Sequence, residues 1–255
     1  TSLASKILKT FAILALICLI LIFAVILYFS RDLPNYKKLA NYDPPVMSRL
    51  YASDGKLIEE YATQKRNYVP INFIPRNIQN AFLAAEDSNF YYHHGIDVKS
   101  LLRAVIQNFS RVQEGRQLVG GSTITQQVVK NILLTKERTF TRKIKEAILA
   151  IRISKTLSKK RVLELYLNEI YLGYRSYGVA AAALNYFNKS LDELTLAETA
   201  FLAALPKAPS TYDPKKKYHR ALIRRNWVIN RMLEDRHINK SQAEIAKSTP
   251  IILRQ

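Results

Sequence analysis

The uncharged apolar run at residues 10–30, "TFAILALICLILIFAVILYFS", constrains the fold of this chain more than any other feature. As a helix, a run of this length crosses the roughly 30 Å hydrocarbon core of a bilayer. A secretion signal would have a shorter apolar core and a small-residue cleavage site, whereas this run ends in "LYFSRDLP", which has no such site. We therefore predict one retained transmembrane helix.

The charges that flank the run predict its orientation. Lys6 and Lys9 precede it, and a basic flank favours the cytoplasmic side of a membrane. Residues 1–9 would then form a cytoplasmic tail, with the rest of the chain outside. Lys37 and Lys38 lie near the far end of the run, so the charge asymmetry is modest.

The chain is strongly basic, with 39 Lys and Arg against 20 Asp and Glu and a formal net charge of +19. Such an excess points to an anionic partner. For a domain tethered outside a membrane, nucleic acid is an unsuitable partner, and lipid headgroups or lipid-linked phosphates fit better. The single cysteine, Cys18, lies in the apolar run and predicts neither a disulfide nor a metal site.

The rest of the chain has mostly helical patterns after a short β element. Residues 31–45 contain three prolines and are predicted to form an extended linker, and Asp54-Gly55 between two short runs predicts a hairpin. Gly173 suits a helix C-cap, and residues 144–151 carry isoleucines on one stripe. Helical patterns cover 75–89, 97–112, 123–134, 141–157, 159–173, 195–205 and 215–235.

Two adjacent carboxylates, Glu86 and Asp87, stand where the first of these helices should end. A carboxylate at a helix C-terminus among apolar and aromatic side chains has a raised pKa, as a general base near neutral pH requires. The alternative is a helix end in water, and this stretch alone favours that alternative about two to one.

The histidines that follow, His93 and His94, do not have the spacing of a helical zinc pair. A structural hydrogen bond that holds the loop is the better prediction for His93, and the sequence assigns no role to His94.

The stretch "GGSTITQQVVKN", residues 120–131, places two glycines and two hydroxyls at a helix start. Free N–H groups there could bind an anion, and Gln127 and Lys130 can share one face of the helix. A well-capped helix with solvated polar residues explains the same pattern equally well.

The stretch "TRKIKEA" places Arg142 and Glu146 at i, i+4, next to Lys143. A surface ion pair is the simple interpretation and would contribute only a few tenths of a kcal/mol. The functional interpretation is a cationic clamp beside a second carboxylate. Two carboxylates and a cationic patch are the layout that sugar transfer from a diphosphate leaving group needs: one acid deprotonates the acceptor hydroxyl, and the cations neutralise the charge that grows on the leaving group.

Taken together, these motifs resemble the peptidoglycan glycosyltransferase module, glycosyltransferase family 51, of class A penicillin-binding proteins. The resemblance covers roughly residues 45–230, and the stretch after the anchor is similar to the 1A type. Five blocks occur in the family order: "EDSNFYYHHG", "GGSTITQQVVKN", "RKIKE", "KKRVLELYLNEIYLG" and "RRNWVINRM".

The resemblance implies a mostly α, lysozyme-like domain over residues 46–235, with a smaller membrane-associated lobe. It implies a bacterial enzyme of the cytoplasmic membrane that polymerises lipid II into β-1,4 glycan with inversion and releases undecaprenyl pyrophosphate. Lipid II, lipid-linked nascent glycan, the bilayer, moenomycin-type inhibitors and a cell-wall synthesis complex would be its partners. Residues 236–255 would lead into a downstream domain, and a monofunctional enzyme is the alternative.

The resemblance also implies roles for individual residues. Glu86 would be the general base on the acceptor 4-hydroxyl, and Glu146 the second essential carboxylate near the donor diphosphate. Tyr166, Asn168 and Arg224 would be structural. The remaining residues implied to hold substrate or shape the cleft are Asp87, Phe90, His93, Ser122, Thr123, Gln127, Lys130, Asn131, Arg142 and Lys143.

No D-x-D ligand motif occurs, and no cofactor is required. A Mg²⁺ or Mn²⁺ ion, where present, would bridge the substrate diphosphate.

Two other functions fit parts of the pattern. A lysozyme-like glycan hydrolase could use one glutamate as an acid, but it would need neither the anchor nor the cationic clamp. An inert membrane scaffold could use the basic face alone, but it would not depend on Glu86.

Overall fold

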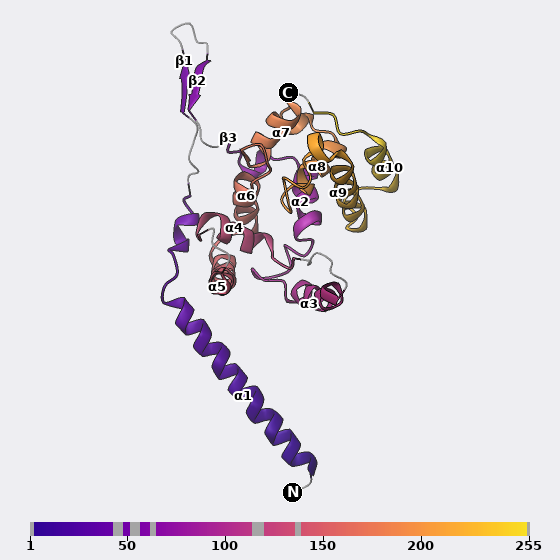
Figure 1. The fold of residues 1–255 in the computed structure, drawn as a ribbon. Helices are drawn as coiled ribbons and strands as arrows, with labels where there is room; N and C mark the ends of the chain where they lie inside the picture. The colour runs from indigo at the N-terminus through magenta and orange to yellow at the C-terminus, as the bar shows by residue number, and fades with distance from the viewer. Residues whose placement is uncertain are drawn as a thin grey trace.

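The computed structural model describes residues 3–42, 48–51, 57–61, 65–113, 120–135 and 139–253, and within these it is predominantly helical (Figure 1). The mostly α class is therefore confirmed. The α-helices are α1 (Leu3–Ser30), α2 (Arg76–Glu86), α3 (Val98–Gln113), α4 (Ile124–Ile132), α5 (Phe140–Thr156), α6 (Lys159–Glu169), α7 (Val179–Phe187), α8 (Leu196–Ala204), α9 (Pro214–Glu234) and α10 (Lys240–Ser248). The shorter elements are η1 (Tyr36–Leu39), β1 (Ser48–Tyr51), β2 (Leu57–Tyr61), β3 (Lys65–Arg66), η2 (Ile71–Phe73), β4 (Ser176–Tyr177) and η3 (Leu191–Glu193).

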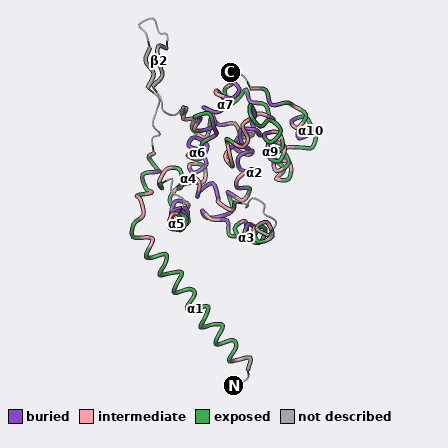
Figure 2. Tube along the Cα trace, in the orientation of Figure 1, coloured by how far each residue is buried: buried purple, intermediate pink, exposed green. Residues whose placement is uncertain are grey.

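The helix α1 projects from the domain and is exposed along almost its whole length (Figure 2). Its stretch Ser5–Ser30 is long and apolar enough to cross a membrane. Nothing in the described part of the chain covers these apolar side chains, so a bilayer is the environment that would bury them.

The predicted linker is only partly extended. After Pro34, residues Tyr36–Leu39 form the 3₁₀ turn η1, and Leu39 is buried. The Arg161 guanidinium donates to the Tyr42 carbonyl at 3.0 Å. The sequence prediction was wrong here because Leu39 has a core site to fill, which ties this segment to the domain.

The predicted β element is present: β1 and β2 pair antiparallel, with Ser48 opposite Tyr61. The predicted Asp54-Gly55 turn lies outside the described residues.

The core lies among α2, α4, α6, α8 and α9, whose small and branched apolar side chains form one cluster. The predicted capping box of α8 is present, since Thr195 and Glu198 bond each other's backbone N–H. The C-terminal helix α10 packs on α9 and is anchored by the fully buried Arg225, which donates to the Thr249 and Lys247 carbonyls. Residues 236–253 are therefore packed against the domain.

Two local predictions were wrong. The helix α6 ends at Glu169, not at Gly173, because the Ile170 carbonyl accepts from the Gly178 N–H at 2.8 Å in a short ladder. On α5 the buried face holds Glu146, Leu149, Ala150 and Ile153, while the isoleucine stripe lies at or near the surface.

The helix α3 carries an apolar stripe that faces away from the protein. Its members follow helical spacing and include Leu102, Val105, Ile106 and Phe109, the last 73% exposed. The helix lies on the side of the domain from which α1 leaves (Figure 1). This arrangement is what a smaller membrane-associated lobe requires.

Candidate active site

Glu86 is the last residue of α2 and opens onto a cleft of about 390 Å³ between α2, α3 and α9. The helix ends there because the backbone turns at Asp87, whose N–H still donates to the Leu83 carbonyl at 2.8 Å. The cleft is lined by Ala84, Ala85, Glu86, Asp87, Ser88, Asp97, Ser100, Arg103, Ala104, Gln107, Gly120, Gly121, Ser122, Thr123, Trp227, Arg231 and Glu234.

Burial raises the pKa of Glu86. A hydrogen bond from Gln127 Nε2 to Glu86 Oε2, 2.9 Å long, and the charges of Arg224, Lys207 and Lys130 oppose that rise. The net direction is upward, as the helix-end argument predicts. A carboxylate with a raised pKa is a stronger base than one in water and remains available to accept a proton.

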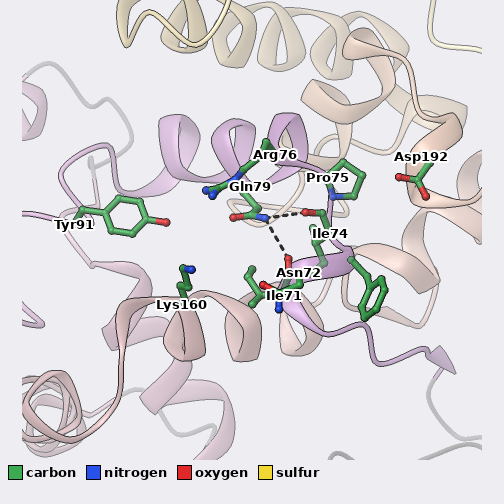
Figure 3. Close-up of a pocket in the computed structure, with 10 residues that line it drawn as sticks. Ile71, Asn72, Ile74, Pro75, Arg76, Gln79, Tyr91, Lys160 and Asp192 are labelled. Atoms are coloured by element: carbon green, nitrogen blue, oxygen red, sulfur yellow. Dashed lines mark hydrogen bonds between the residues drawn. The ribbon is translucent and has the colours of Figure 1, made fainter.

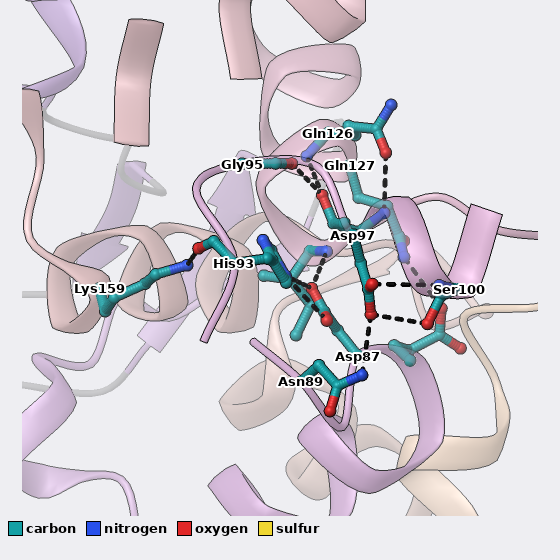
Figure 4. A network of polar contacts seen from close by, with 12 residues as sticks. Asp87, Asn89, His93, Gly95, Asp97, Ser100, Gln126, Gln127 and Lys159 are labelled. Carbon is teal, nitrogen blue, oxygen red and sulfur yellow. Dashed lines mark hydrogen bonds and ion pairs between the residues drawn. The ribbon is translucent and has the colours of Figure 1, made fainter. Parts of the chain in front are cut away.

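Asp87, next in the chain, is used within the protein (Figure 4). Its oxygens lie 2.9 and 3.0 Å from His93 Nε2, and Oδ2 accepts the Ile124 N–H at 2.9 Å. The Asp87 and His93 side chains are 3% and 7% exposed. Because Ile124 is the first residue of α4, the Asp87 carboxylate also lies at the positive end of the α4 dipole. Asp87 and His93 therefore position the cleft wall, and the loop-holding role predicted for His93 is confirmed.

The loop that carries these residues is held from two further directions. Thr123 Oγ1 donates to the Gly95 carbonyl at 2.6 Å, and Lys159 Nζ donates to the His93 carbonyl at 2.6 Å (Figure 4). Phe90 is fully buried, with the Lys159 ammonium 4.4 Å from its ring centroid. Phe90 therefore supports the cleft from behind its surface, whereas Thr123 lies in its lining. His94 is exposed, and its role is still unassigned.

The start of α4 is capped within the protein. Thr123 and Gln126 form a reciprocal capping box, which uses the hydroxyl and amide groups that an anion would need. The helix cap that the simple interpretation predicts is therefore present.

One face of α4 connects the two acidic residues. Gln127 donates a hydrogen bond to Glu86. About one turn later on α4, Lys130 interacts electrostatically with both Glu86 and Glu146. Shielding from water lowers the pKa of Lys130, and the Glu146 charge opposes this. Gln127 and Lys130 do share a face; Gln127 is half-buried, and Lys130 and Asn131 are exposed.

The second carboxylate, Glu146, is 2% exposed and paired with two cations of its own helix. Arg142 Nη1 lies 3.2 Å from Oε2, and the Lys143 ammonium bonds Oε1. Lys143 Nζ also donates to Ser122 Oγ at 2.8 Å, which ties α5 to the cleft wall. Both oxygens of Glu146 are thus occupied by cations, so its effect is to hold a positive cluster in place. We name Lys130, Arg142 and Lys143 the cation cluster.

Sequence reasoning missed part of the surroundings of Glu86. The charges of Lys207 and Arg224 act on its carboxylate, although Arg224 had been assigned a structural role. The Arg224 guanidinium lies 3.8 Å from the centroid of the Trp227 ring, which lines the cleft. The block "RRNW" could have indicated this arrangement. Its first arginine and its tryptophan are three residues apart, so on a helix they lie on one face.

The metal prediction can be compared with the side chains present. In the part of the chain that the structure describes, no three His, Cys, Asp or Glu side chains are grouped to hold a metal ion.

The geometry places the desolvated Glu86 carboxylate near a positive cluster, and α4 connects the two. This pairing suits a reaction in which a hydroxyl loses a proton while an anionic group departs.

Comparison with known proteins gives a consistent result. The family model described as Transglycosylase matches residues 54–233. Penicillin-binding protein 1A of Rickettsia bellii is 53% identical over 97% of this chain and 31% of its own length. The Escherichia coli K12 protein of the same name is 45% identical over 96% of this chain and 29% of its own. The chain therefore spans about a third of the length of these relatives.

Among solved structures, the 2.6 Å crystal structure of penicillin-binding protein 1A from Haemophilus influenzae is similar, with 32% identity and a TM-score of 0.48. The similarity covers 84% of this chain and 22% of that one.

Proposed function

The chain belongs to the transglycosylase family, and from that premise we propose that it is a membrane-anchored peptidoglycan glycosyltransferase. It would polymerise lipid II into β-1,4 glycan strands for the bacterial cell wall and release undecaprenyl pyrophosphate. Moenomycin-type inhibitors would compete for the same cleft. The observation that carries the proposal is the face of α4 on which Gln127 bonds Glu86 and Lys130 lies near both Glu86 and Glu146.

In the proposed reaction Glu86 takes the proton from the 4-hydroxyl of the acceptor GlcNAc. The acceptor oxygen then forms a bond to C1 of the donor sugar as the bond from C1 to the diphosphate oxygen breaks. The diphosphate leaves with the bonding electron pair. Attack from the face opposite the leaving group inverts the anomeric centre, which converts an α-linked diphosphate into a β-glycosidic bond.

The cation cluster would stabilise the charge that grows on the diphosphate. Arg142 and Lys143 are suited to this because Glu146 fixes their positions without reaching the reaction itself. Fixed cations need no reorganisation when the bond breaks, which is the main advantage of such a site over water.

The anchor and α3 support a substrate drawn from a membrane. The helix α1 would hold the domain at one face of the cytoplasmic membrane, and the apolar stripe of α3 would dip into the same leaflet. A lipid-linked substrate could then reach the cleft while its chain stays in the bilayer.

The decisive experiment is gel analysis of lipid II polymerisation by the wild-type chain and by Glu86→Gln. We expect near-complete loss of polymer for the variant, with binding to lipid II vesicles retained. Glu244→Gln, on exposed α10, is the matched control and should polymerise normally. Polymerisation at the parental rate by Glu86→Gln would refute the assignment of the base. Cleavage of preformed glycan without polymer from lipid II would indicate a hydrolase instead.

A further inference from the structure

A second pocket, of about 430 Å³, lies at the opposite end of α2 from Glu86 (Figure 3). It is lined by Ile71, Asn72, Phe73, Ile74, Pro75, Arg76, Gln79, Tyr91, Lys160 and Asp192. The helix α2 runs from Arg76 to Glu86 at about 1.5 Å per residue, so its two ends lie roughly 15 Å apart. None of the lining residues belongs to the cleft described above.

The floor of this pocket holds a buried amide with one unused atom. Gln79 is 5% exposed, and its Nε2 donates to the Ile74 and Ile71 carbonyls at 2.7 and 3.3 Å. These two acceptors fix the orientation of the Gln79 side-chain amide. If the amide were flipped, Oε1 would face the two carbonyl oxygens. Gln79 Oε1 accepts no hydrogen bond from the described residues, and it points into the opening between Tyr91 and Lys160 (Figure 3).

The rim of the pocket holds positive charge. Arg76 and Lys160 are both exposed, and neither forms an ion pair within the described ranges. The first turn of α2 adds donors, because its N-cap is Pro75, which has no capping side chain; the Ile78 N–H bonds Asn77 Oδ1, and the Arg76 and Asn77 N–H groups have no hydrogen-bond acceptor among the described residues. Free N–H groups and the helix dipole at this end favour a negatively charged ligand.

The pocket also holds acceptors, which a simple inorganic anion would not satisfy. Besides Gln79 Oε1, the exposed Asp192 carboxylate lies on the wall. A ligand that fits must therefore bring an anionic group and, beside it, an N–H donor. Phe73 and Tyr91, which are 72% and 49% exposed, add aromatic rings to the lining.

We propose that this pocket is a binding site for a short acidic peptide. The peptide carboxylate would pair with Arg76 and Lys160, and an adjoining backbone N–H would donate to Gln79 Oε1. A carboxylate and an amide N–H are adjacent in any peptide that contains Asp, Glu or a free C-terminus, and inorganic phosphate offers no comparable fixed donor. The site does not rest on the glycosyltransferase function proposed above.

The test uses the full chain in detergent micelles and a fluorescein-labelled Ala-Glu-Ala-Glu peptide, followed by fluorescence anisotropy. We expect saturable binding that weakens about tenfold or more in the double variant Arg76→Ala/Lys160→Ala, since hydrogen bonds to charged groups are strong. The matched control, Lys216→Ala/Arg220→Ala, removes two exposed cations of α9 and should bind like the wild type. Circular dichroism spectra of each variant would check that it is folded.

Three results would overturn the proposal. One is equal loss of binding in both double variants, which would indicate attraction to the net positive charge alone. Another is equal binding of the neutral Ala-Gln-Ala-Gln peptide, which would remove the role of the carboxylates. The third is displacement of the labelled peptide by inorganic phosphate as efficiently as by unlabelled peptide, which would indicate an anion site without peptide recognition. Tyr91→Phe keeps the wall and the charges and should bind within about twofold of wild type.

Discussion

Gln127 Nε2 donates a 2.9 Å hydrogen bond to Glu86 Oε2 and thereby joins the start of α4 to the end of α2. The donor is neutral, so it orients the carboxylate without adding the full charge of an ion pair. Burial raises the pKa of Glu86 while this bond opposes the rise, and the basicity of the residue depends on the balance between them.

That balance predicts the effect of Gln127→Ala on the pH dependence of polymerisation. Loss of the hydrogen bond removes a contribution that lowers the pKa of Glu86, so the base will ionise only at higher pH. We expect the acid limb of the kcat/KM profile for lipid II to move to higher pH, with partial recovery of rate in alkaline buffer. A uniformly lower rate with an unmoved limb would show that Gln127 acts only on structure.

The raised pKa of Glu86 also predicts a stability change in Glu86→Gln. An acid whose pKa is higher in the folded protein destabilises the fold when ionised, and this cost grows as pH rises from its ordinary value of 4.5 through the folded value. The neutral variant should therefore have a higher thermal midpoint than wild type at pH 8, and the two should converge near pH 4. A lower midpoint for the variant at pH 8 would contradict the direction given for the pKa.

Glu146→Gln should disperse the cation cluster. Without the carboxylate, the Arg142 and Lys143 side chains lose the partner that fixes them, and their mutual repulsion is no longer offset. We expect polymerisation to fall by about 10²-fold or more, with a reduced slope of rate against ionic strength. Glu244→Gln breaks an exposed i, i+3 pair with Lys247 and should leave both measurements unchanged.

The apolar stripe of α3 can be located relative to the bilayer with spin labels. In a Cys18→Ser background, Ile106→Cys carries a nitroxide on the stripe and Glu244→Cys carries one at an exposed polar position of α10. In liposomes, electron paramagnetic resonance should show position 106 accessible to oxygen, which partitions into lipid, and position 244 accessible to a water-soluble nickel complex. Equal nickel accessibility at both positions would mean that the stripe stays out of the membrane.

The parts of the site that could be predicted from sequence depend on short spacings. The end of α2 at Glu86, the capped start of α4 at Thr123 and the i, i+4 pair of Arg142 with Glu146 are each fixed within one or two turns of helix. Backbone geometry alone brings such residues together, whatever the rest of the chain does.

The parts that could not be predicted depend on contacts between distant segments. Arg224 lies far from Glu86 in sequence, and only the packing of α9 on α2 brings its charge close. The early end of α6 also depends on a contact outside the helix. The Gly178 N–H donates to the Ile170 carbonyl, and the spacing of apolar residues does not predict the turn between these two residues. The buried face of α5 was misread because the isoleucine stripe is apolar, yet a paired Glu146 occupies the core side.

The bond from Lys145 Nζ to the Asp32 carbonyl, 3.3 Å long, joins α5 to the segment that leaves the anchor. Lys145 is the immediate neighbour of Glu146, so this contact links the segment after the anchor to the carboxylate of the cation cluster. Under the proposed function, the link would favour a position of the cluster close to the membrane surface, where the diphosphate of a lipid-linked substrate lies. Such a substrate would reach the cluster by diffusion in the plane of the membrane.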